Sequence, residues 1–261
     1  MFIVFNKAKI SSYIISVSTV MILFVVAFLF TYQDNTIATA ASVKALPIYQ
    51  VATEEKRVAF TMNCAWNADD IDSILDTLSK YKIHITFFMV GDWVDKYPEA
   101  VKKIADSGHE IGNHSDTHPH VNSLTLEKNI EQIQTCSDKI EKIIGKKTTL
   151  YRGPYGEYND TVIEAAKSQN HTAIQWNLDT LDYTGITGEE MWKRLKDKLQ
   201  PGSIILSHNG TKHTADSLDM LLHQIIEEKG YQIVTVSELI YIENYIIDSN
   251  GIQRVQNTEK E

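Results

Sequence analysis

The chain has 261 residues, of which 43% are hydrophobic and 23% are charged, and this is enough apolar sequence for a globular domain with a sizeable core. Its formal net charge is −9 and no basic cluster occurs, which argues against nucleic acid as a partner. The only two cysteines, Cys64 and Cys136, have no spacing that requires a disulfide, so we expect two free, buried thiols.

The N-terminal region carries the first predicted element, an uncharged run of 20 residues at 13–32. That is the length needed to cross a hydrocarbon core. Lys7 and Lys9 precede it and Asp34 follows it, so the positive-inside rule places the rest of the chain outside the cytoplasm. The small residues at 38–40 resemble a cleavage site, which makes a signal peptide the alternative. We predict a single-pass membrane protein with an extracytoplasmic C-terminal domain, or a secreted protein if the segment is cleaved.

Composition divides the chain into five parts. They are a short cytoplasmic N-terminus at 1–12, the membrane anchor at 13–32, a polar linker at 33–55, one domain at 56–242 and a polar C-terminal tail at 243–261.

Within the domain, short β-rich runs alternate with amphipathic helical patterns. Strands are predicted at 58–62, 85–90, 110–113, 149–152, 172–176, 203–207 and 232–234. Apolar residues three and four apart predict helices around 71–78, 126–144 and 218–226. No Gly-rich phosphate loop follows any strand, which argues against an open doubly wound sheet. About seven strand–helix repeats therefore predict an α/β fold, a distorted (β/α) barrel.

Polar residues collect directly after five of the predicted strands. In β/α barrels, the reacting groups lie on the loops that leave the carboxyl ends of the strands. We therefore expect these residues at one rim of the barrel. They are Asn63, Cys64, Asp69 and Asp70 after the first strand, and the segments 114–120, 152–156, 176–183 and 206–209 after later ones.

His114 and His118 are four residues apart, a spacing that can direct two imidazoles at one metal ion. The pair alone is a weak signal, because many such pairs are surface or capping histidines. With an acidic residue nearby it becomes a set of two histidines and one carboxylate, which leaves positions open for water and substrate.

Three further residues allow two interpretations each. Arg152 is either a solvated turn residue or a buried group that orients a carboxylate. His208 is either a core histidine or, paired with an acid of the 179–182 segment, an imidazole held ready to donate a proton. Trp176 is either a core residue or a wall on which a sugar stacks.

Taken in order, these segments resemble the polysaccharide deacetylase family, the NodB-homology domain of carbohydrate esterase family 4. The likeness spans residues 56–241. The segment 114–118 matches the family motif H-[ST]-x-x-H, and Arg152 begins a match to R-x-P-[YF]. The segment 179–183 matches D-x-x-D-[WY], and 206–208 matches L-x-H. Four ordered motifs make a far stronger signal than any one of them.

The first family motif is altered. The family usually has T-F-D-D-G, whose first Asp is the catalytic base and whose second Asp binds metal, whereas this chain has Asn63 and Cys64 there. The Cys-Ala-Trp form resembles a branch that includes spore-associated deacetylases, in which an acid further along binds the metal. Asp70 is its counterpart here, and Cys64 is the alternative ligand. An acid at this place also suits a helix N-terminus.

The resemblance implies a specific chemistry. A divalent cation, with Zn²⁺ expected, would be held by Asp70, His114 and His118 and would polarise the amide carbonyl. His208, oriented by Asp182, would protonate the departing amine. The resemblance also implies the remaining roles: an oxyanion contact from the backbone N–H of Tyr155, tuning of the base by Arg152, and substrate binding by Tyr155, Trp176, Asp179, Tyr183 and Leu206.

The base position holds Asn63, and an amide does not accept a proton at neutral pH. Loss of a general base typically slows a reaction by about 10²–10⁴-fold, which leaves slow turnover rather than none. Asp69 and Asp179 are potential substitutes. The function indicated is metal-dependent removal of N-acetyl groups from cell-wall polysaccharide, either peptidoglycan or a chitin-like amino sugar. The alternative is a glycan-binding pseudoenzyme of the same fold.

Overall fold

The computed structural model describes residues 15–26, 28 and 45–256, and these fall into two compact units, 1–44 and 45–261. Residues 15–26 are helical. Within the described residues, no helix is both long enough and apolar enough to span a membrane. The predicted segments 1–12 and most of 33–55 lie outside the described residues, as do the two ends of the predicted anchor at 13–32.

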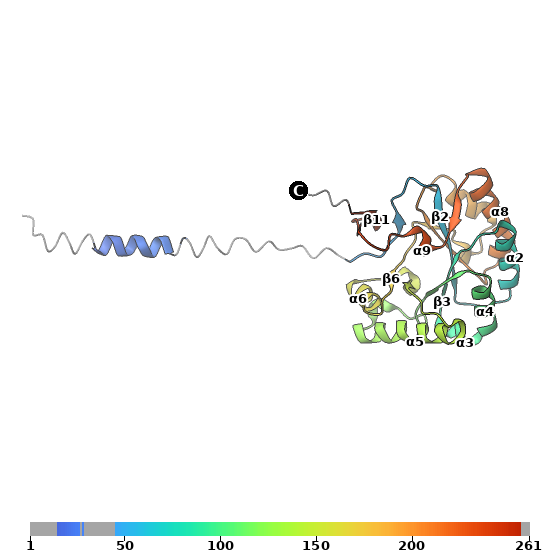
Figure 1. Cartoon of the computed structure of the whole chain (residues 1–261), viewed down its shortest axis with the longest axis horizontal. Helices are drawn as coiled ribbons and strands as arrows, with labels where there is room; N and C mark the ends of the chain where they lie inside the picture. Colours follow the sequence, from blue (N-terminus) through green and yellow to red (C-terminus); the bar gives the residue numbers. More distant parts are fainter. Residues whose placement is uncertain (1–14, 27, 29–44, 257–261) are drawn as a thin grey trace, which may run out of the picture. The chain divides into compact units, whose positions relative to one another are not determined.

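The second unit is built on a curled parallel sheet (Figure 1). Its strands follow the order β6-β5-β4-β3-β2-β8-β7, and β9 pairs with the first part of β2. All the pairs in this sheet are parallel. The strands are β2 (Arg57–Cys64), β3 (Thr86–Met89), β4 (Glu110–Asn113), β5 (Leu150–Tyr151), β6 (Thr172–Ala173), β7 (Leu178–Asp179), β8 (Ile204–His208) and β9 (Gln232–Val234).

Helices connect these strands and pack on the outer face of the sheet, where Figure 1 shows α5 and α3 beside β3, and α2 beside α8. They are α2 (Ile71–Tyr81), α3 (Gly91–Lys96), α4 (Pro98–Asp106), α5 (Leu126–Ile144), α6 (Asp160–Ser168), α7 (Gly188–Leu195) and α8 (Thr214–His223). The short helix α9 (Val236–Leu239) instead packs in a second cluster with Ala59 of β2. Four single turns complete the chain: η2 (Val121–Ser123), η3 (Pro154–Gly156), η4 (Asp182–Thr184) and η5 (Gln224–Glu228).

The alternation of β2 decides which side chains reach the inside of the curled sheet. Successive residues of a strand point to opposite faces. Phe60, Met62 and Cys64 pack in the main core between the sheet and the helices. Thr61 and Asn63 point the other way, where both contact Arg152. The pleat therefore directs Asn63 toward the inner face and Cys64 away from it.

The sheet is open rather than closed into a full barrel, because its path ends at β6 on one side and at β7 on the other. Part of the gap is spanned by the segment that starts at Ile48, which forms a bridge to Ile174, while Gln50 forms one to Ser203. The segment continues as β1 (Gln50–Val51), which joins a second, three-stranded sheet with β11 (Ile252–Val255) and β10 (Tyr245–Ile247).

The predicted parallel α/β architecture is confirmed, and each of the seven predicted strands is present with slightly different ends. Three features differ from the prediction. The barrel is half open, the two-residue strand β7 was not predicted, and the predicted linker and tail contain β1, β10 and β11. The tail residues alternate polar and apolar side chains too weakly to mark strands. β10 and β11 pair with each other, and β11 also pairs with β1, about 200 residues earlier, which local patterns do not detect. Both cysteines are free and buried, as predicted.

Candidate active site

A cavity of about 460 Å³ opens at the carboxyl ends of the central strands. It brings together nine of the predicted site residues, namely Asn63, His114, His118, Tyr155, Trp176, Asp179, Tyr183, Leu206 and His208. Ala65, Trp66 and Gly156 also line it. Asp70, Arg152 and Asp182 do not line it.

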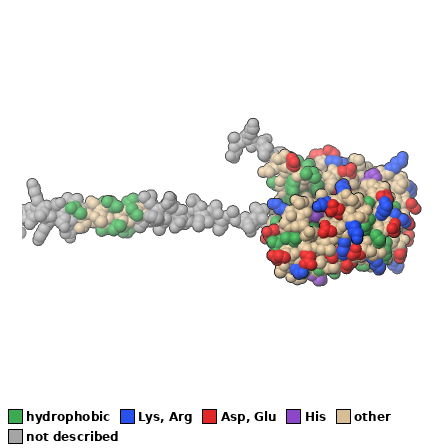
Figure 2. Space-filling view, turned by 60° about the horizontal axis from the view of Figure 1, so that its bottom comes forward, with side chains coloured by type: hydrophobic (Ala, Val, Ile, Leu, Met, Phe, Trp, Pro, Cys, Tyr) green, Lys and Arg blue, Asp and Glu red, His purple; other side chains and the backbone are tan. Residues whose placement is uncertain are grey.

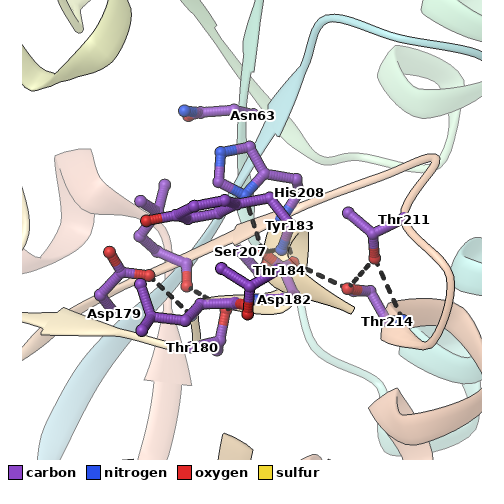
Figure 3. Close-up of polar contacts among 12 residues, drawn as sticks. Asn63, Asp179, Thr180, Asp182, Tyr183, Thr184, Ser207, His208, Thr211 and Thr214 are labelled. Carbon is purple, nitrogen blue, oxygen red and sulfur yellow. Dashed lines mark hydrogen bonds and ion pairs between the residues drawn. The ribbon is translucent and has the colours of Figure 1, made fainter. Parts of the chain in front are cut away.

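His208 and Asp182 form the best-defined pair of the site. The register of β2 and β8 places His208 directly opposite Asn63, at the end of both strands. His208 Nδ1 lies 2.8 Å from Asp182 Oδ1, and the His208 backbone N–H donates to Asp182 Oδ2 at 2.6 Å. Because Nδ1 faces the carboxylate, the other ring nitrogen, Nε2, is left to face the cavity (Figure 3).

Asp182 is fully buried, and its oxygens accept two more hydrogen bonds. The Thr214 hydroxyl donates to Oδ2 at 2.7 Å, and the Tyr183 backbone N–H donates to Oδ1 at 2.9 Å. Figure 3 shows these groups converging beneath the imidazole. These hydrogen bonds hold the Asp182 carboxylate in place, so it can orient the imidazole of His208.

Two aromatic rings flank His208 on the cavity side. The Trp66 and Tyr183 ring centroids each lie 5.3 Å from the imidazole centroid. Their side chains are about half exposed, 48% for Trp66 and 49% for Tyr183, so they offer apolar faces to a ligand. Amphipathic rings that are partly exposed at a cleft are well suited to stack on a sugar ring.

Arg152 is buried completely but has no carboxylate in hydrogen-bond contact, which is unusual for a guanidinium. Its Nη1 donates to Thr61 Oγ1 and Asn63 Oδ1, each at 2.9 Å, and its Nη2 donates to the Gln175 carbonyl oxygen at 3.1 Å. Its Nε has no hydrogen-bond partner among the described residues. Burial lowers the pKa of Arg152 to about 9, so it remains charged at neutral pH.

Aromatic faces partly compensate for this missing anion. The Arg152 guanidinium carbon lies 4.0 Å from the Phe88 ring centroid and 5.4 Å from that of Trp176. Cation–π contacts of this kind stabilise a desolvated cation by about 2 kcal/mol. The predicted buried position of Arg152 is thus confirmed, and the carboxylate that it would orient is an amide, Asn63.

The segment from His114 to His118 shows part of the arrangement expected of metal-binding imidazoles. His114 Nδ1 lies 2.6 Å from the Arg152 carbonyl oxygen, which fixes Nδ1–H as donor and leaves Nε2 with a free lone pair. The two ring centroids are 5.0 Å apart. Burial lowers the pKa of both His114 and His118, which favours the neutral form that binds metals.

The predicted third ligand is not brought to these imidazoles. Asp70 Oδ1 accepts from the Asn209 side chain at 3.1 Å, and Oδ2 accepts from the Gly210 backbone N–H at 2.7 Å. Asp70 is the N-cap residue of α2, where it ties that helix to the loop after β8. Within the described part of the chain, no three or more His, Cys, Asp and Glu side chains are grouped closely enough to hold a metal ion.

The alternative ligand, Cys64, is excluded by the pleat of β2, because its side chain lies in the hydrophobic core. Burial also raises the pKa of the Cys64 thiol, which disfavours the thiolate that binds zinc. The imidazoles of His114 and His118 therefore suit a divalent cation. The described residues supply no third His, Cys, Asp or Glu ligand beside them.

Tyr155 forms the opposite rim of the cavity in a strained conformation, with φ = 58°. Its ring stacks on His120 at a centroid distance of 4.3 Å and meets the His118 ring edge-on at 4.5 Å. Glu157 holds His120 through a 2.7 Å contact to Nδ1. Residues in the left-handed region are costly and concentrate at functional sites. The oxyanion role of the Tyr155 N–H stays a prediction.

Sequence reasoning did not assign Trp66 to the site. The available signal was a tryptophan directly after a strand end, in the Cys-Ala-Trp sequence. In the structure Trp66 is exposed, and large apolar side chains are rarely left exposed beside a polar rim without a ligand. Asp69 is exposed and does not line the cavity.

Comparison with known proteins gives a consistent result. A family model described as polysaccharide deacetylase matches residues 50–174. A peptidoglycan-N-acetylglucosamine deacetylase of Bacillus cereus is 32% identical, over 74% of this chain and 92% of that protein. Peptidoglycan-N-acetylmuramic acid deacetylase PdaC of Bacillus subtilis is 35% identical over 72% of this chain, which spans only 40% of that relative.

Among solved structures, a CE4 family pseudoenzyme from Bacillus anthracis superimposes with a TM-score of 0.71 at 32% identity, covering 74% of this chain and 68% of that chain. A mutant of the same protein, described as having restored enzymatic activity, gives the same TM-score of 0.71. Both active deacetylases and a pseudoenzyme thus resemble this chain at similar levels of identity.

Proposed function

Because the chain belongs to the polysaccharide deacetylase family, we propose that it hydrolyses the N-acetyl groups of a cell-wall amino sugar, at a rate limited by Asn63. Peptidoglycan is the substrate favoured here, since the similar curated proteins are named for it. A chitin-like glycan offers the same acetamido group, and a substrate panel distinguishes the two.

The observation that carries the proposal is the His208–Asp182 pair. Asp182 accepts from both the ring and the backbone of His208, and the ring faces the cavity. A buried carboxylate that stabilises a protonated imidazole makes that imidazole a proton donor. A module that only binds glycan would not need a desolvated acid beneath an imidazole at the base of its cavity.

The chemistry assigns a step to each group. His208 gives its Nε2 proton to the amide nitrogen as the C–N bond breaks, and Asp182 keeps the ring oriented throughout. Trp66 and Tyr183 hold the sugar against the imidazole. A preorganised N–H at Tyr155 would stabilise negative charge on the carbonyl oxygen.

A divalent cation would be held by His114 and His118, whose ring geometry suits metal binding. Such a cation, when bound, polarises the acetyl carbonyl and acidifies a water molecule. Zinc is the metal we propose, because imidazole nitrogens are among its preferred ligands.

A second candidate function is favoured by one observation. The amide of Asn63 occupies the base position, and a structurally similar protein with 32% identity is described as a pseudoenzyme. A glycan-binding protein that has lost turnover would keep the aromatic flanks and the cavity. Binding without acetate release is its signature.

We also propose that the domain works outside the cytoplasm. The sequence supports this, because the uncharged run at 13–32 follows Lys7 and Lys9. A membrane anchor and a cleaved signal peptide would both export the domain, and fractionation of cells that produce the full chain separates the two outcomes.

The test is acetate release from peptidoglycan and from chitooligosaccharides by the purified chain. We expect slow release that stops with a chelator and returns when zinc is added back. Elemental analysis of the same sample measures the metal content. Glycan binding with no acetate release, in the presence of zinc, would contradict the deacetylase proposal and favour the pseudoenzyme.

A further inference from the structure

The site retains a proton donor but has an amide where the proton acceptor is expected, so the acceptor must be sought elsewhere in the cavity. Asp179 is the only Asp or Glu among the residues that line it. We infer that Asp179 accepts the proton of the attacking water and replaces Asn63 as the general base. This inference rests on the proposed deacetylase function.

The strand order places Asp179 at the same rim as the rest of the site. Asp179 ends β7 and is paired in register with Leu206 on β8. Two residues further along β8 stands His208, which is opposite Asn63 on β2. Figure 3 shows the Asp179 carboxylate beside Tyr183, whose ring contacts His208.

One Asp179 oxygen is fixed and the other is free to act. Oδ1 accepts from the Leu181 backbone N–H at 2.8 Å, which sets the orientation of the carboxylate. Within the described part of the chain, no hydrogen bond to Oδ2 is formed. Oriented carboxylates with one free oxygen have the form of a general base.

The electrostatic surroundings increase the basicity of this carboxylate. Burial raises the pKa of Asp179, and the nearby Asp182 carboxylate acts in the same direction. The hydrogen bond from the Leu181 N–H opposes the rise, as do the charges of His208 and Arg194, and the buried Arg152 is also within electrostatic reach. A carboxylate with a raised pKa is a stronger base.

The other acids near the rim are unsuitable. Both Asp70 oxygens already accept hydrogen bonds, Oδ1 from the Asn209 side chain and Oδ2 from the Gly210 backbone N–H. Asp182 is fully buried and engaged by His208. Asp69 is exposed and does not line the cavity.

The step balances with groups on the page. The water oxygen bonds to the acetyl carbon while one water proton moves to Asp179. His208, protonated at the start, gives its proton to the amide nitrogen, and the C–N bond breaks. The products are acetic acid and the free amine, and the proton on Asp179 returns to His208 through solvent.

Four proteins test the inference: the wild type, Asp179→Asn, Asn63→Asp and the double variant. In the wild-type background we expect Asp179→Asn to lower kcat/KM for acetate release by about 10²-fold or more. In the Asn63→Asp background the new acid can act as the base. There we expect Asp179→Asn to lower kcat/KM by a factor about ten times smaller than in the wild-type background. The acid limb of the pH profile should be lost with Asp179→Asn alone and return in the double variant.

The controls separate catalysis from folding. The amide of Asp179→Asn can still accept from Leu181, so we expect an unchanged melting temperature. Asp197→Asn removes the same charge from an exposed position outside the cavity and should leave the rate unchanged. Asp179→Glu, which keeps a carboxylate, should restore part of the rate and the acid limb.

Three results would overturn the inference. If the wild type releases acetate and Asp179→Asn releases it equally fast, the base lies elsewhere and the deacetylase proposal stands. Equal losses in both backgrounds would mean that Asp179 has a structural role only. If the wild type releases no acetate from any glycan, both the inference and the proposed function are wrong.

Discussion

At the scale of single residues, the most informative feature is the guanidinium of Arg152, which is buried against neutral acceptors. Ordinary proteins pair a desolvated Arg with a carboxylate, because an unpaired buried charge is costly. Here the contact at 2.9 Å is to the Asn63 amide oxygen. An amide at this position cannot accept a proton at neutral pH, and it gives the buried cation no anionic partner.

The first prediction concerns Asn63→Asp. The new carboxylate keeps the size of the amide and gives Arg152 an anionic acceptor, so we expect unfolding free energy at pH 7 to rise by about 2 kcal/mol. Acetate release should rise by about 10²-fold or more. Denaturant unfolding and the acetate assay measure the two effects.

Asn113→Asp is a matched control for this change. Asn113 is also fully buried, but its Nδ2 donates to the Ile133 carbonyl and the Ser137 hydroxyl, and the carbonyl oxygen cannot donate to a carboxylate in its place. We expect this variant to lose stability. A stability loss in both variants would refute the view that Arg152 lacks an anion.

The second prediction concerns the support of the proton donor. Thr214→Val removes a hydroxyl that donates to Asp182 at 2.7 Å and leaves His208 untouched. We expect acetate release to fall by about tenfold, because the carboxylate orients the imidazole less well. Thr211→Val, which lies just before α8 and contacts Thr214 but not Asp182, should have a smaller effect on rate. Equal rates for Thr214→Val and wild type would show that this hydroxyl does not support the donor.

At the scale of elements, α5 holds the loop that carries both imidazoles. The Gln132 side-chain oxygen accepts from the backbone N–H groups of Asp116 and Thr117, each at 3.0 Å. Lys139 pairs with the Asp116 carboxylate at 2.6 Å. The loop needs this support because Ser115 and His118 have positive φ angles, 69° and 55°, which disfavour residues with a side chain.

The third prediction therefore addresses Gln132→Leu, which removes the acceptor of two loop N–H groups. We expect zinc affinity, measured by titration calorimetry, to fall by about tenfold, and stability to fall by about 2 kcal/mol. Gln132→Glu keeps an oxygen acceptor at the same place and should bind zinc nearly as well as wild type. Equal affinities for all three proteins would show that the loop does not depend on α5.

The fourth prediction concerns pH and the junction of β3 with β4. The Ile85 backbone N–H donates to His109 Nδ1 at 3.2 Å, and burial lowers the pKa of His109 from 6.5 to about 4. Between these two pKa values the unfolded chain binds more protons than the folded chain. The stability that depends on neutral His109 is therefore fully present above pH 6.5 and is lost as the pH falls toward 4. The loss should reach at most about 3 kcal/mol.

Denaturant unfolding between pH 4 and 7 measures this loss. His109→Gln, which cannot be protonated in this range, should flatten the pH dependence. His223→Gln is the control, because His223 is exposed. An identical pH dependence in wild type and His109→Gln would show that other groups cause it.

At the scale of the whole domain, a half-open sheet needs a closing segment, and the C-terminal strands help to provide it. Gln253 of β11 is fully buried and bonds both the N–H and the carbonyl oxygen of Tyr241. The same strand pairs with β1, which bridges toward the gap between β6 and β7. Acidic and basic side chains are interspersed on the face of this domain drawn in Figure 2.

The fifth prediction follows from that closure. Gln253→Ala leaves two buried backbone groups of Tyr241 without partners, so we expect a loss of about 2 kcal/mol in denaturant unfolding. Val255→Ala, on the same strand but 51% exposed, should change stability by no more than about 0.5 kcal/mol. Similar small effects in both variants would mean that β11 contributes little to the fold.

Sequence patterns predicted much of this molecule where local physics decides the outcome. The helix at 71–81 follows from apolar spacing, and the pairing of His208 with Asp182 follows from matched motifs. The hydrogen bonds of Asp70 were not predicted, because its partners, Asn209 and Gly210, lie about 140 residues away in sequence. β7 has two residues, too few to show a pattern.

Composition could not predict that Arg152 is buried without a hydrogen-bonded carboxylate. The burial of Arg152 depends on how four strands curl around it, and its contacts with Phe88 and Trp176 come from separate strands and loops. Local sequence identified which residues carry the chemistry. Only the fold shows which of them share a cavity.

The most direct test is mass spectrometry of a fully N-acetylated glycan after prolonged incubation with the zinc-loaded chain and, in parallel, with its His208→Ala variant. We expect free amino sugars to accumulate with the wild type and to be absent with the variant, whose fold should be intact by melting temperature. A glycan that remains fully acetylated after incubation with the wild type would contradict deacetylation by this site.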